Sequence, residues 1–122
     1  MNKRIAAFKF AFEGVIDFFT NHYHPKIHLA FAIIAVTFAF ILGFSAIEWC
    51  ILLVCIGFVW VAEAMNTAIE YLCNKITLHN DPEIKKVKDM AAGAVLMASC
   101  IVFIIGLLLF IPKIVHLINY KI

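Results

Sequence analysis

Two long stretches of the chain carry no charged residue. No Asp, Glu, Lys or Arg occurs between Lys26 and Glu48 or between Asp89 and Lys113, and each gap holds over twenty residues. About twenty helical residues span the roughly 30 Å of hydrocarbon in a bilayer. A third apolar stretch, 49–62, is too short to cross alone, so it must continue through the two glutamates that follow it. Because backbone in lipid must hydrogen-bond within itself, and no alternation of period two is present, these stretches predict three membrane-spanning helices.

The ends of the predicted spans carry local signals. Ser45 and Glu48 have the spacing of a capping box, so we expect the second span to begin there and to form a tight hairpin with the first. Asp81 before Pro82 is a typical helix start. The helix that begins there is expected to run into the third span and to stop near Pro112.

Residues 4–20 show a different pattern. Apolar side chains fall near one side of a helix, whereas Lys9, Glu13 and Asp17 form a ladder of i,i+4 spacing on another. This predicts an N-terminal amphipathic helix on the membrane surface; the alternative is a helix packed on protein partners. We therefore predict an all-α membrane protein with a single domain, 1–122. Its elements are expected at about 4–20 for the surface helix and at about 27–46, 46–73 and 90–112 for the spans.

The composition agrees with a membrane domain. Of the 122 residues, 65% are hydrophobic and 15% are charged, and the mean hydropathy is +1.00. Soluble domains are roughly 45–50% apolar and about 25% charged, and a small one cannot bury this much apolar surface. The net charge of +2 is too small to hold a phosphate backbone, which excludes a nucleic-acid binder.

The distribution of basic residues predicts the orientation. Basic residues precede the first span and separate the second from the third, whereas the hairpin turn between the first two has none. The N-terminus and the second loop are therefore expected on the cytoplasmic side. Lys113 and Lys121, near the C-terminus on the outer side, are a mild objection to this assignment.

Polar residues of the second span gather on one helix face. Glu63, Asn66 and Glu70 are spaced i, i+3 and i+7, which places them within about 60° of one another. Counted inward from the hairpin, this face begins in the inner hydrocarbon and ends at the cytoplasmic interface. Lys88 and Asp89 immediately precede the third span and so lie at the same level. Five polar residues from two helices are thus expected at one membrane boundary.

Such a group suits phosphoryl transfer. A charge inside a membrane costs at least about 2.5–3.5 kcal/mol, which makes it a candidate functional group; the structural alternative is a polar cluster that holds helices together. One carboxylate can accept a proton from a hydroxyl, the other can hold Mg²⁺, and the lysine can neutralise phosphate oxygens. A lipid hydroxyl would arrive from the bilayer and a nucleotide from the cytoplasm. No P-loop or glycine-rich kinase loop is present, which excludes a soluble kinase fold.

Two other classes of protein remain open. An ion-conducting subunit would also carry carboxylates in a span, but it needs polar residues across the outer half, which is uniformly apolar here. A purely structural trimer needs no Lys88–Asp89 pair at the depth of the carboxylates. The histidines offer no clear metal site, because Pro25 between His24 and His28 favours a helix start over a metal pair.

Two segments carry a family resemblance. EAMNTAIE at 63–70 and KDMAAGAV at 88–95 resemble the paired signature of the prokaryotic diacylglycerol kinase family, small membrane lipid kinases that include the undecaprenol kinases. The resemblance covers nearly the whole chain. It implies a homotrimer in the bacterial inner membrane that transfers the γ-phosphate of MgATP to a lipid alcohol.

The resemblance also implies roles for the matching residues. Glu63 would be the general base and contact the lipid, with Asn66 as its orienting neighbour. Glu70 would hold Mg²⁺ and contact ATP, while Lys88 would contact the phosphates with Asp89 beside it. Further nucleotide contacts are implied for His79, Asn80, Asp81 and Lys3 or Arg4, and a lipid contact for Ala92.

One position departs from the family pattern. A glutamate that helps Glu70 with the metal is replaced by His22, and hard cations such as Mg²⁺ prefer oxygen ligands. Asn21 or Glu13 could substitute, or Glu70 and ATP could hold the metal alone. A softer ion such as Mn²⁺ or Zn²⁺ is a further option. Asn74 also replaces a frequent aspartate.

The resemblance favours one substrate branch. AAGAV at 91–95, Glu48-Trp49 at the hairpin and GLLLFIPK at 106–113 are more similar to the undecaprenol kinases. The small residues within 91–95 would leave a narrow groove between helices for a polyprenyl chain. Diacylglycerol is the alternative substrate, and a non-enzymatic or ion-conducting membrane subunit is the remote alternative.

Overall fold

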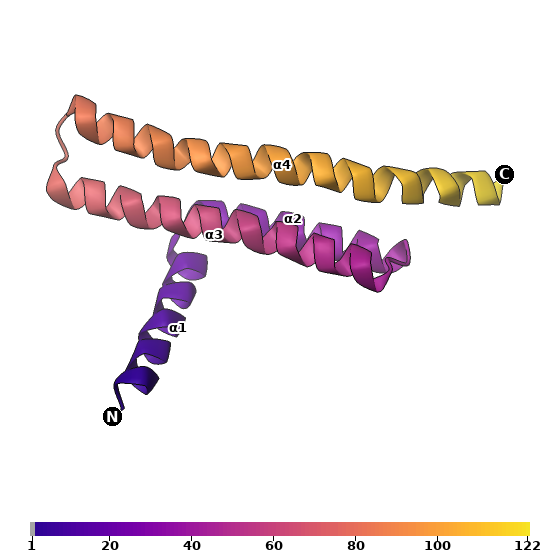
Figure 1. Ribbon diagram of the computed structural model, residues 1–122, viewed down its shortest axis with the longest axis horizontal. Coiled ribbons are helices and arrows are strands. Elements are labelled where there is room, and N and C mark those ends of the chain that lie inside the picture. Colours follow the sequence, from indigo (N-terminus) through magenta and orange to yellow (C-terminus); the bar gives the residue numbers. More distant parts are fainter. Residues whose placement is uncertain (1) are drawn as a thin grey trace.

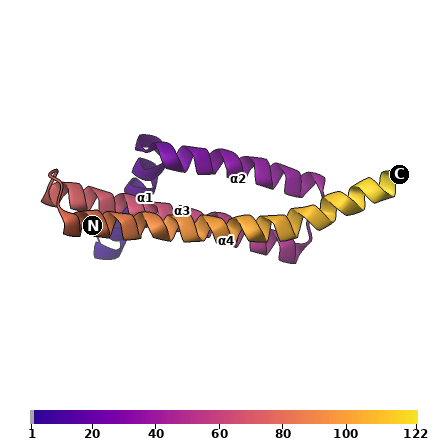
Figure 2. The same ribbon diagram turned by 90° about the horizontal axis from the view of Figure 1, so that it is seen from above.

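A computed structural model describes residues 2–122, and four α-helices make up most of the chain. They are α1 at Lys3–Asn21, α2 at Tyr23–Ile41, α3 at Ala46–Ile76 and α4 at Pro82–Lys121. Helices α2, α3 and α4 run alongside one another, whereas α1 leaves the bundle at a steep angle (Figure 1). Figure 2 shows α2 lying to one side of the α3–α4 pair.

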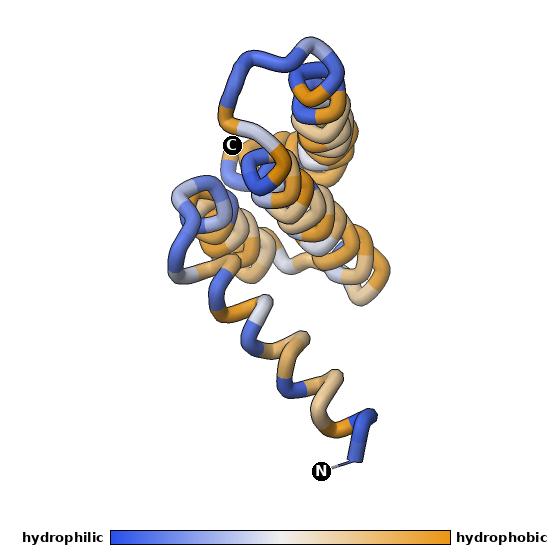
Figure 3. The backbone as a smooth tube through the Cα atoms, turned by 90° about the vertical axis from the view of Figure 1, so that its left-hand side faces the viewer, coloured by the Kyte–Doolittle hydropathy of each residue, from blue (hydrophilic) through white to orange (hydrophobic). Residues whose placement is uncertain are grey.

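The bundle has the surface of a membrane protein. Helices α2, α3 and α4 are long and apolar enough to cross a bilayer. Large apolar side chains on all three, such as Phe31, Phe58 and Phe103, are exposed. Figure 3 shows polar residues concentrated at the end where α1 joins α2 and α3 joins α4, with apolar residues along the helices behind them. These features confirm the predicted all-α architecture with three helices that are candidate membrane spans.

Local capping interactions begin α3 and α4 where the sequence predicts. The Ser45 hydroxyl accepts a hydrogen bond from the Glu48 backbone N–H, and the Glu48 carboxylate accepts one from the Ser45 N–H at 2.8 Å, which completes a capping box. Asp81 Oδ1 accepts hydrogen bonds from two backbone N–H groups in the first turn of α4. Gly43 has a φ of 67°, a left-handed conformation that the hairpin turn requires.

The first membrane helix is shifted relative to the predicted range. The expected span covered 27–46, whereas α2 begins at Tyr23 and ends at Ile41. Pro25 lies in the first turn of α2, where its missing N–H removes no hydrogen bond. At the other end, residues 42–45, which the prediction placed in the helix, form the hairpin turn.

The prediction that the last helix stops near Pro112 is wrong. Helix α4 continues through Pro112 to Lys121. A proline inside a helix removes one backbone hydrogen bond and bends the axis without necessarily ending the helix. In Figure 2 the yellow end of α4 turns away from the line of its earlier turns. Lys113, which directly follows the proline, contacts Glu48 and the Gly43 carbonyl at the α2–α3 hairpin. These contacts keep this part of α4 beside α3.

An apolar core and one ion pair join the hairpin to α4. Ala39, Phe44 and Leu52 are buried together. Lys113 Nζ lies 3.0 Å from Glu48 Oε2 and also donates a hydrogen bond to the backbone carbonyl of the turn glycine at 3.3 Å. The charge of Lys113 on the predicted outer side is therefore neutralised by a partner from α3.

Helix α1 contacts the bundle through its last turns. Phe18 is its one buried residue among those that the structure describes. The ring of Phe19 packs edge-on against Trp60 of α3, with ring centroids 5.2 Å apart. Most other apolar side chains of α1, including Phe8 and Phe12, are exposed. The placement of α1 on a membrane surface stays a prediction.

Candidate active site

The predicted base is the most deeply buried charged residue. Glu63 is 5% exposed, and it is the one buried charged residue within 2–122. Its carboxylate oxygen Oε1 lies 3.0 Å from Nε2 of His28, which projects from α2. An ionised carboxylate in an apolar environment is costly unless a hydrogen bond or opposite charge compensates it. The imidazole of His28 supplies that compensation.

Sequence reasoning did not find His28 as a partner of Glu63. The two residues are 35 positions apart, so no helical spacing connects them. The i,i+4 spacing of His24 and His28 instead raised the question of a metal pair, which Pro25 between them made unfavourable. One signal was available: His28 is the one ionisable side chain inside the first uncharged stretch.

The polar face of α3 continues from Glu63 toward the α3–α4 loop. Asn66 Oδ1 is buried without a hydrogen-bond partner, and Glu70, one turn further, is exposed. Asn74 accepts a hydrogen bond from Lys88 Nζ of α4 at 2.6 Å. This contact brings Lys88 to the polar face of α3, as the sequence predicts.

Asp89 occupies a different position from Lys88. Its carboxylate forms an exposed i,i+4 ion pair with Lys85 on the surface of α4. Lys88 instead points to Asn74 on the neighbouring helix. The two adjacent residues therefore have different partners, although both line the same cavity at the start of α4.

That cavity lies between the α3–α4 loop and the first turns of α4 and has a volume of about 540 Å³. Five of the residues predicted to contact the nucleotide line it: His79, Asn80, Asp81, Lys88 and Asp89. Helix α4 begins at this cavity, and the partial positive charge of a helix N-terminus favours anions. The lining carries two lysines, Lys85 and Lys88, and two aspartates, of which Asp81 already accepts hydrogen bonds from two N–H groups of the helix start.

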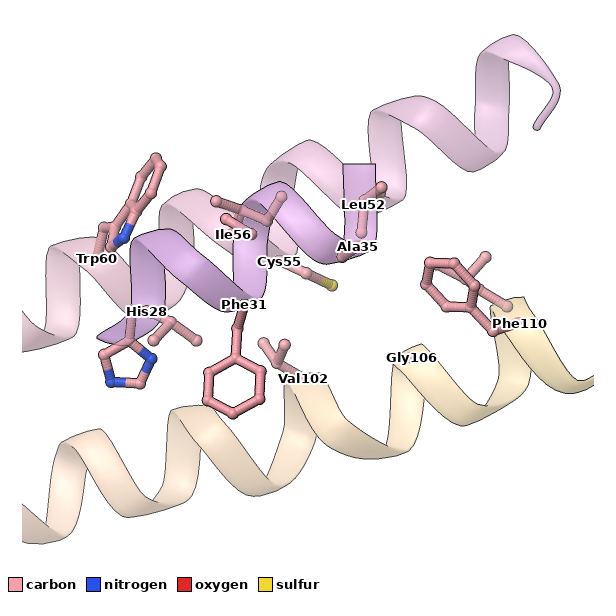
Figure 4. A pocket seen from close by; sticks show the side chains of 13 residues that line it. His28, Phe31, Ala35, Leu52, Cys55, Ile56, Trp60, Val102, Gly106 and Phe110 are labelled. Carbon is pink, nitrogen blue, oxygen red and sulfur yellow. The ribbon is translucent and has the colours of Figure 1, made fainter. Parts of the chain in front are cut away.

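A second, apolar cavity of about 160 Å³ lies between α2, α3 and α4. Figure 4 shows its lining, with Phe31 from α2, Cys55 from α3 and Val102 and Gly106 from α4. His28 also lines it, so the Glu63–His28 pair stands beside an otherwise apolar space.

His22, which the family resemblance predicts to replace a metal-binding glutamate, contacts two other residues. Its Nε2 lies 3.5 Å from the carboxylate of Asp17, and its ring packs edge-on against Tyr71. Asn21 donates a hydrogen bond to the other oxygen of Asp17 at 2.6 Å. The hydrogen bond from Asn21, with a smaller contribution from His22, lowers the pKa of Asp17 below its ordinary value.

The residues present fit a Mg²⁺ ion that is shared with ATP. Within 2–122 no three His, Cys, Asp or Glu side chains are grouped to hold a metal by themselves. Mg²⁺ is commonly bound by one or two protein oxygens together with substrate phosphates. The exposed carboxylate of Glu70 and the unpartnered Oδ1 of Asn66 are two such oxygens, one helical turn apart.

Lys3 and Ala92, predicted to contact nucleotide and lipid, form no described interaction with the other predicted site residues. Lys3 is exposed in the first turn of α1, whose N-terminal end projects away from the bundle (Figure 1). Ala92 is exposed on α4, next to the buried Ala91. Their roles stay predictions.

Comparisons with known proteins identify the family of this chain. A family model described as Prokaryotic diacylglycerol kinase matches residues 9–110. The chain is 36% identical over 113 residues to an undecaprenol kinase of Bacillus subtilis (strain 168), covering 93% of this chain and 92% of that protein. It is 31% identical over 114 residues to a diacylglycerol kinase of Synechocystis sp., covering 93% of this chain and 65% of that protein.

The chain belongs to the prokaryotic diacylglycerol kinase family. The predicted enzyme class, a membrane-bound lipid kinase that uses ATP, is thereby confirmed. A kinase of this class needs a base for the lipid hydroxyl and a cation near the phosphates. Glu63 is buried on α3, and Lys88 is hydrogen-bonded to Asn74 of the same helix; their roles as base and cation stay predictions.

Proposed function

We propose that this protein phosphorylates undecaprenol with ATP on the cytoplasmic side of a bacterial inner membrane. The observation that carries the proposal is the buried carboxylate of Glu63. Its partner His28 lines an apolar cavity within the predicted span, and a second cavity lies at the α3–α4 loop and the start of α4. A lipid alcohol would reach the apolar cavity from the bilayer, and a nucleotide would reach the loop cavity from the aqueous phase.

In the reaction, Glu63 accepts the proton of the lipid hydroxyl. The hydroxyl oxygen then forms a bond to the γ-phosphorus as the bond to the departing ADP oxygen breaks. Burial of Glu63 keeps water away from the base, so hydrolysis of ATP does not compete with transfer to lipid. Asn66, one turn along the same face, orients the reacting groups through its buried amide.

The nucleotide is bound at the loop cavity. Lys88, held at the α3 face by Asn74, neutralises phosphate oxygens, and Asp89 lines the cavity beside it. His79, Asn80 and Asp81 of the loop surround the rest of the nucleotide. Lys3 and Ala92 are proposed to contact nucleotide and lipid, respectively, on the strength of the family resemblance.

Glu70 and Asn66 would hold the metal ion, Mg²⁺, together with the phosphates of ATP. A bound Mg²⁺ neutralises charge that develops on the phosphoryl group. His22 is a weak ligand for a hard cation and is already engaged by Asp17, so we assign the metal to oxygens of α3. Activation by Mn²⁺ or Zn²⁺ in place of Mg²⁺ would return His22 to the metal site.

The assembly and the orientation are proposed together. In the most apolar stretch of α4, only 6% of the residues are buried within one chain. The remaining residues are free to contact lipid or further copies of the chain. A homotrimer is the assembly that the family resemblance implies. The basic residues before α2 and around the α3–α4 loop support a cytoplasmic N-terminus. Lys113, on the outer side in this orientation, forms an ion pair with Glu48.

Undecaprenol is preferred to diacylglycerol as the substrate. The Bacillus subtilis relative that matches over nearly its whole length is an undecaprenol kinase. The Synechocystis relative is a diacylglycerol kinase, which supports diacylglycerol as the second candidate.

The test uses purified protein in lipid micelles with labelled ATP. Undecaprenol and diacylglycerol are offered separately, each with Mg²⁺, Mn²⁺ or Zn²⁺. We expect labelled undecaprenyl phosphate with Mg²⁺ and less product from diacylglycerol. Glu63→Gln is the inactive control, and Glu83→Gln, an exposed glutamate in the first turn of α4, is the matched active control. No labelled lipid from either substrate under any of the three ions would refute the proposal.

A further inference from the structure

The contact between Glu63 and His28 links two helices at the proposed base. The Nε2 and Oε1 atoms are 3.0 Å apart, and the side chains are 28% and 7% exposed for His28 and Glu63, respectively. An ionised carboxylate has no hydrogen to donate, so Nε2 must carry the hydrogen of this bond. The bond occupies Oε1 and leaves Oε2 to accept a hydrogen bond from the lipid hydroxyl.

This contact does more than compensate a buried charge. A glutamate side chain has three rotatable torsions, and a base must lie within hydrogen-bond reach of the proton it abstracts. A displacement of about 1 Å at a reacting group can cost roughly 10²-fold in rate. The imidazole of His28 comes from a different helix, so the position of the Glu63 carboxylate is set by the packing of α2 on α3.

The location of His28 also connects the base to the apolar cavity. His28 is one of its lining residues, and the indole Nε1 of Trp60, another lining residue, is buried without a hydrogen-bond partner. His28 and Trp60 are therefore the two residues with side-chain nitrogen atoms among the otherwise apolar lining, and His28 is the one that contacts Glu63. A lipid that fills this space brings its polar end toward the pair.

We propose that His28 is a positioning residue for the base: its Nε2–H holds Glu63 so that Oε2 faces the lipid hydroxyl. The inference rests on the proposed function, because it assigns His28 a role in the same transfer. His28 itself forms no bond to the substrate in this proposal. Its effect is on the rate of the chemical step and not on the binding of ATP.

A matched pair of variants separates positioning from simple packing. In His28→Gln the amide nitrogen lies near the place of Nε2 and can still donate to Glu63, whereas in His28→Asn the shorter side chain cannot reach it. We expect His28→Asn to lower kcat about 10- to 100-fold, with the KM values for lipid and ATP changed less than about threefold. His28→Gln should retain at least about a third of wild-type kcat.

Two further variants complete the experiment. Combining His28→Asn with Glu63→Gln should lower the rate no further than Glu63→Gln alone, because the two residues act as one unit. His24→Ala removes an exposed histidine one turn earlier in α2 and should keep wild-type kinetics. Circular dichroism and the thermal midpoint of every variant establish that the kinetics are those of folded protein.

The possible outcomes separate this inference from the proposed function. Wild-type activity together with equal kcat for His28→Asn and wild type would overturn the role of His28 and leave the kinase assignment intact. Equal losses in His28→Gln and His28→Asn with lowered thermal midpoints would show a packing role and also overturn it. A wild-type enzyme that phosphorylates neither lipid would overturn the proposed function and this inference together.

Discussion

The hairpin end of the bundle, around the α2–α3 turn, and the site end, from Glu63 to the α3–α4 loop, satisfy their polar groups differently. At the hairpin end Glu48 accepts a hydrogen bond from Ser45 and pairs with Lys113, which also donates to the turn backbone. At the site end, Asn66 Oδ1 is buried with no partner. Buried polar atoms without partners are rare and costly in proteins, and they cluster where a ligand completes them.

Apolar packing is also more complete at the hairpin end than at the site end. Around the hairpin turn the rings of Phe40 and Trp49 are 4.7 Å apart, and those of Phe44 and Phe110 are 4.9 Å apart. Such contacts fill the space between α2, α3 and α4. The cavity between the same three helices begins at this packing, where Leu52 and Phe110 line it, and extends along the bundle to His28. The hairpin end is therefore the more fully packed of the two, and the proposed function assigns the unfilled space and the free amide oxygen to substrates.

The largest expected effect of a mutation is at the buried carboxylate. Glu63→Gln should lower the rate of lipid phosphorylation by about 10²- to 10⁴-fold, because the amide cannot accept the proton of the hydroxyl. Glu48→Gln, the corresponding change at the hairpin end, should keep the rate within about twofold and lower the thermal midpoint instead. Initial rates and melting curves of both proteins measure the contrast. If Glu48→Gln lost as much activity as Glu63→Gln, the functional division between the two ends would be wrong.

Asn66→Leu should trade activity for stability. The substitution removes a buried oxygen that has no partner in the free protein, so we expect the free energy of unfolding to rise by about 1 kcal/mol. The rate should fall by at least about tenfold, since the substrate and metal lose the amide. Denaturant titration in micelles and kinase assays on the same preparation test both parts. A variant that is less stable than wild type would indicate that Asn66 is structurally satisfied.

Lys113→Met should have the opposite profile. It removes the ion pair to Glu48 and the hydrogen bond to Gly43, so the free energy of unfolding should fall by about 1–2 kcal/mol with little change in rate. Combining it with Glu48→Gln should cost less than the sum of the two single changes. Strict additivity in this double-mutant cycle would show that the pair contributes nothing to folding.

The smallest effect is expected at Asp17. Its lowered pKa means that its interactions with Asn21 and His22 stabilise α1 at pH values above the pKa of the unfolded chain. This contribution is lost as the pH falls through the folded pKa, below about pH 4. Hydrogen exchange of the last turns of α1 should therefore speed up in acid beyond the intrinsic trend in wild type, and Asp17→Asn should lack that step. Identical acid profiles in both proteins would contradict this account.

Local signals predicted much of the fold and part of the site. The caps at Ser45 and Asp81 depend on atoms two or three residues apart, and the face shared by Glu63, Asn66 and Glu70 depends on helical periodicity alone. These features can be calculated from spacing. The level of Lys88 beside α3 was also predicted, because a short loop brings two helix ends together.

Contacts between distant segments were not predictable in this way. Lys113 reaches the Gly43 carbonyl over 70 positions, and this anchoring accompanies a helix that continues past Pro112. The pairing of His28 with Glu63 likewise requires the rotation of α2 relative to α3. Neither rotation nor register between helices is encoded in the spacing of residues within one helix, so these contacts had to be read from the structure.

The Lys113 anchor has a mechanical consequence for the lysine at the other end of the same helix. Lys88 and Lys113 lie on one continuous α4, about 37 Å apart at 1.5 Å per residue. Because the hairpin holds α4 at Lys113, that point acts as a pivot and the rest of the helix as a lever. A tilt of about 5° about it moves Lys88 by roughly 3 Å, close to the length of a hydrogen bond. Small angular freedom at the hairpin is therefore enough to move Lys88, the proposed phosphate-binding cation, relative to the proposed base.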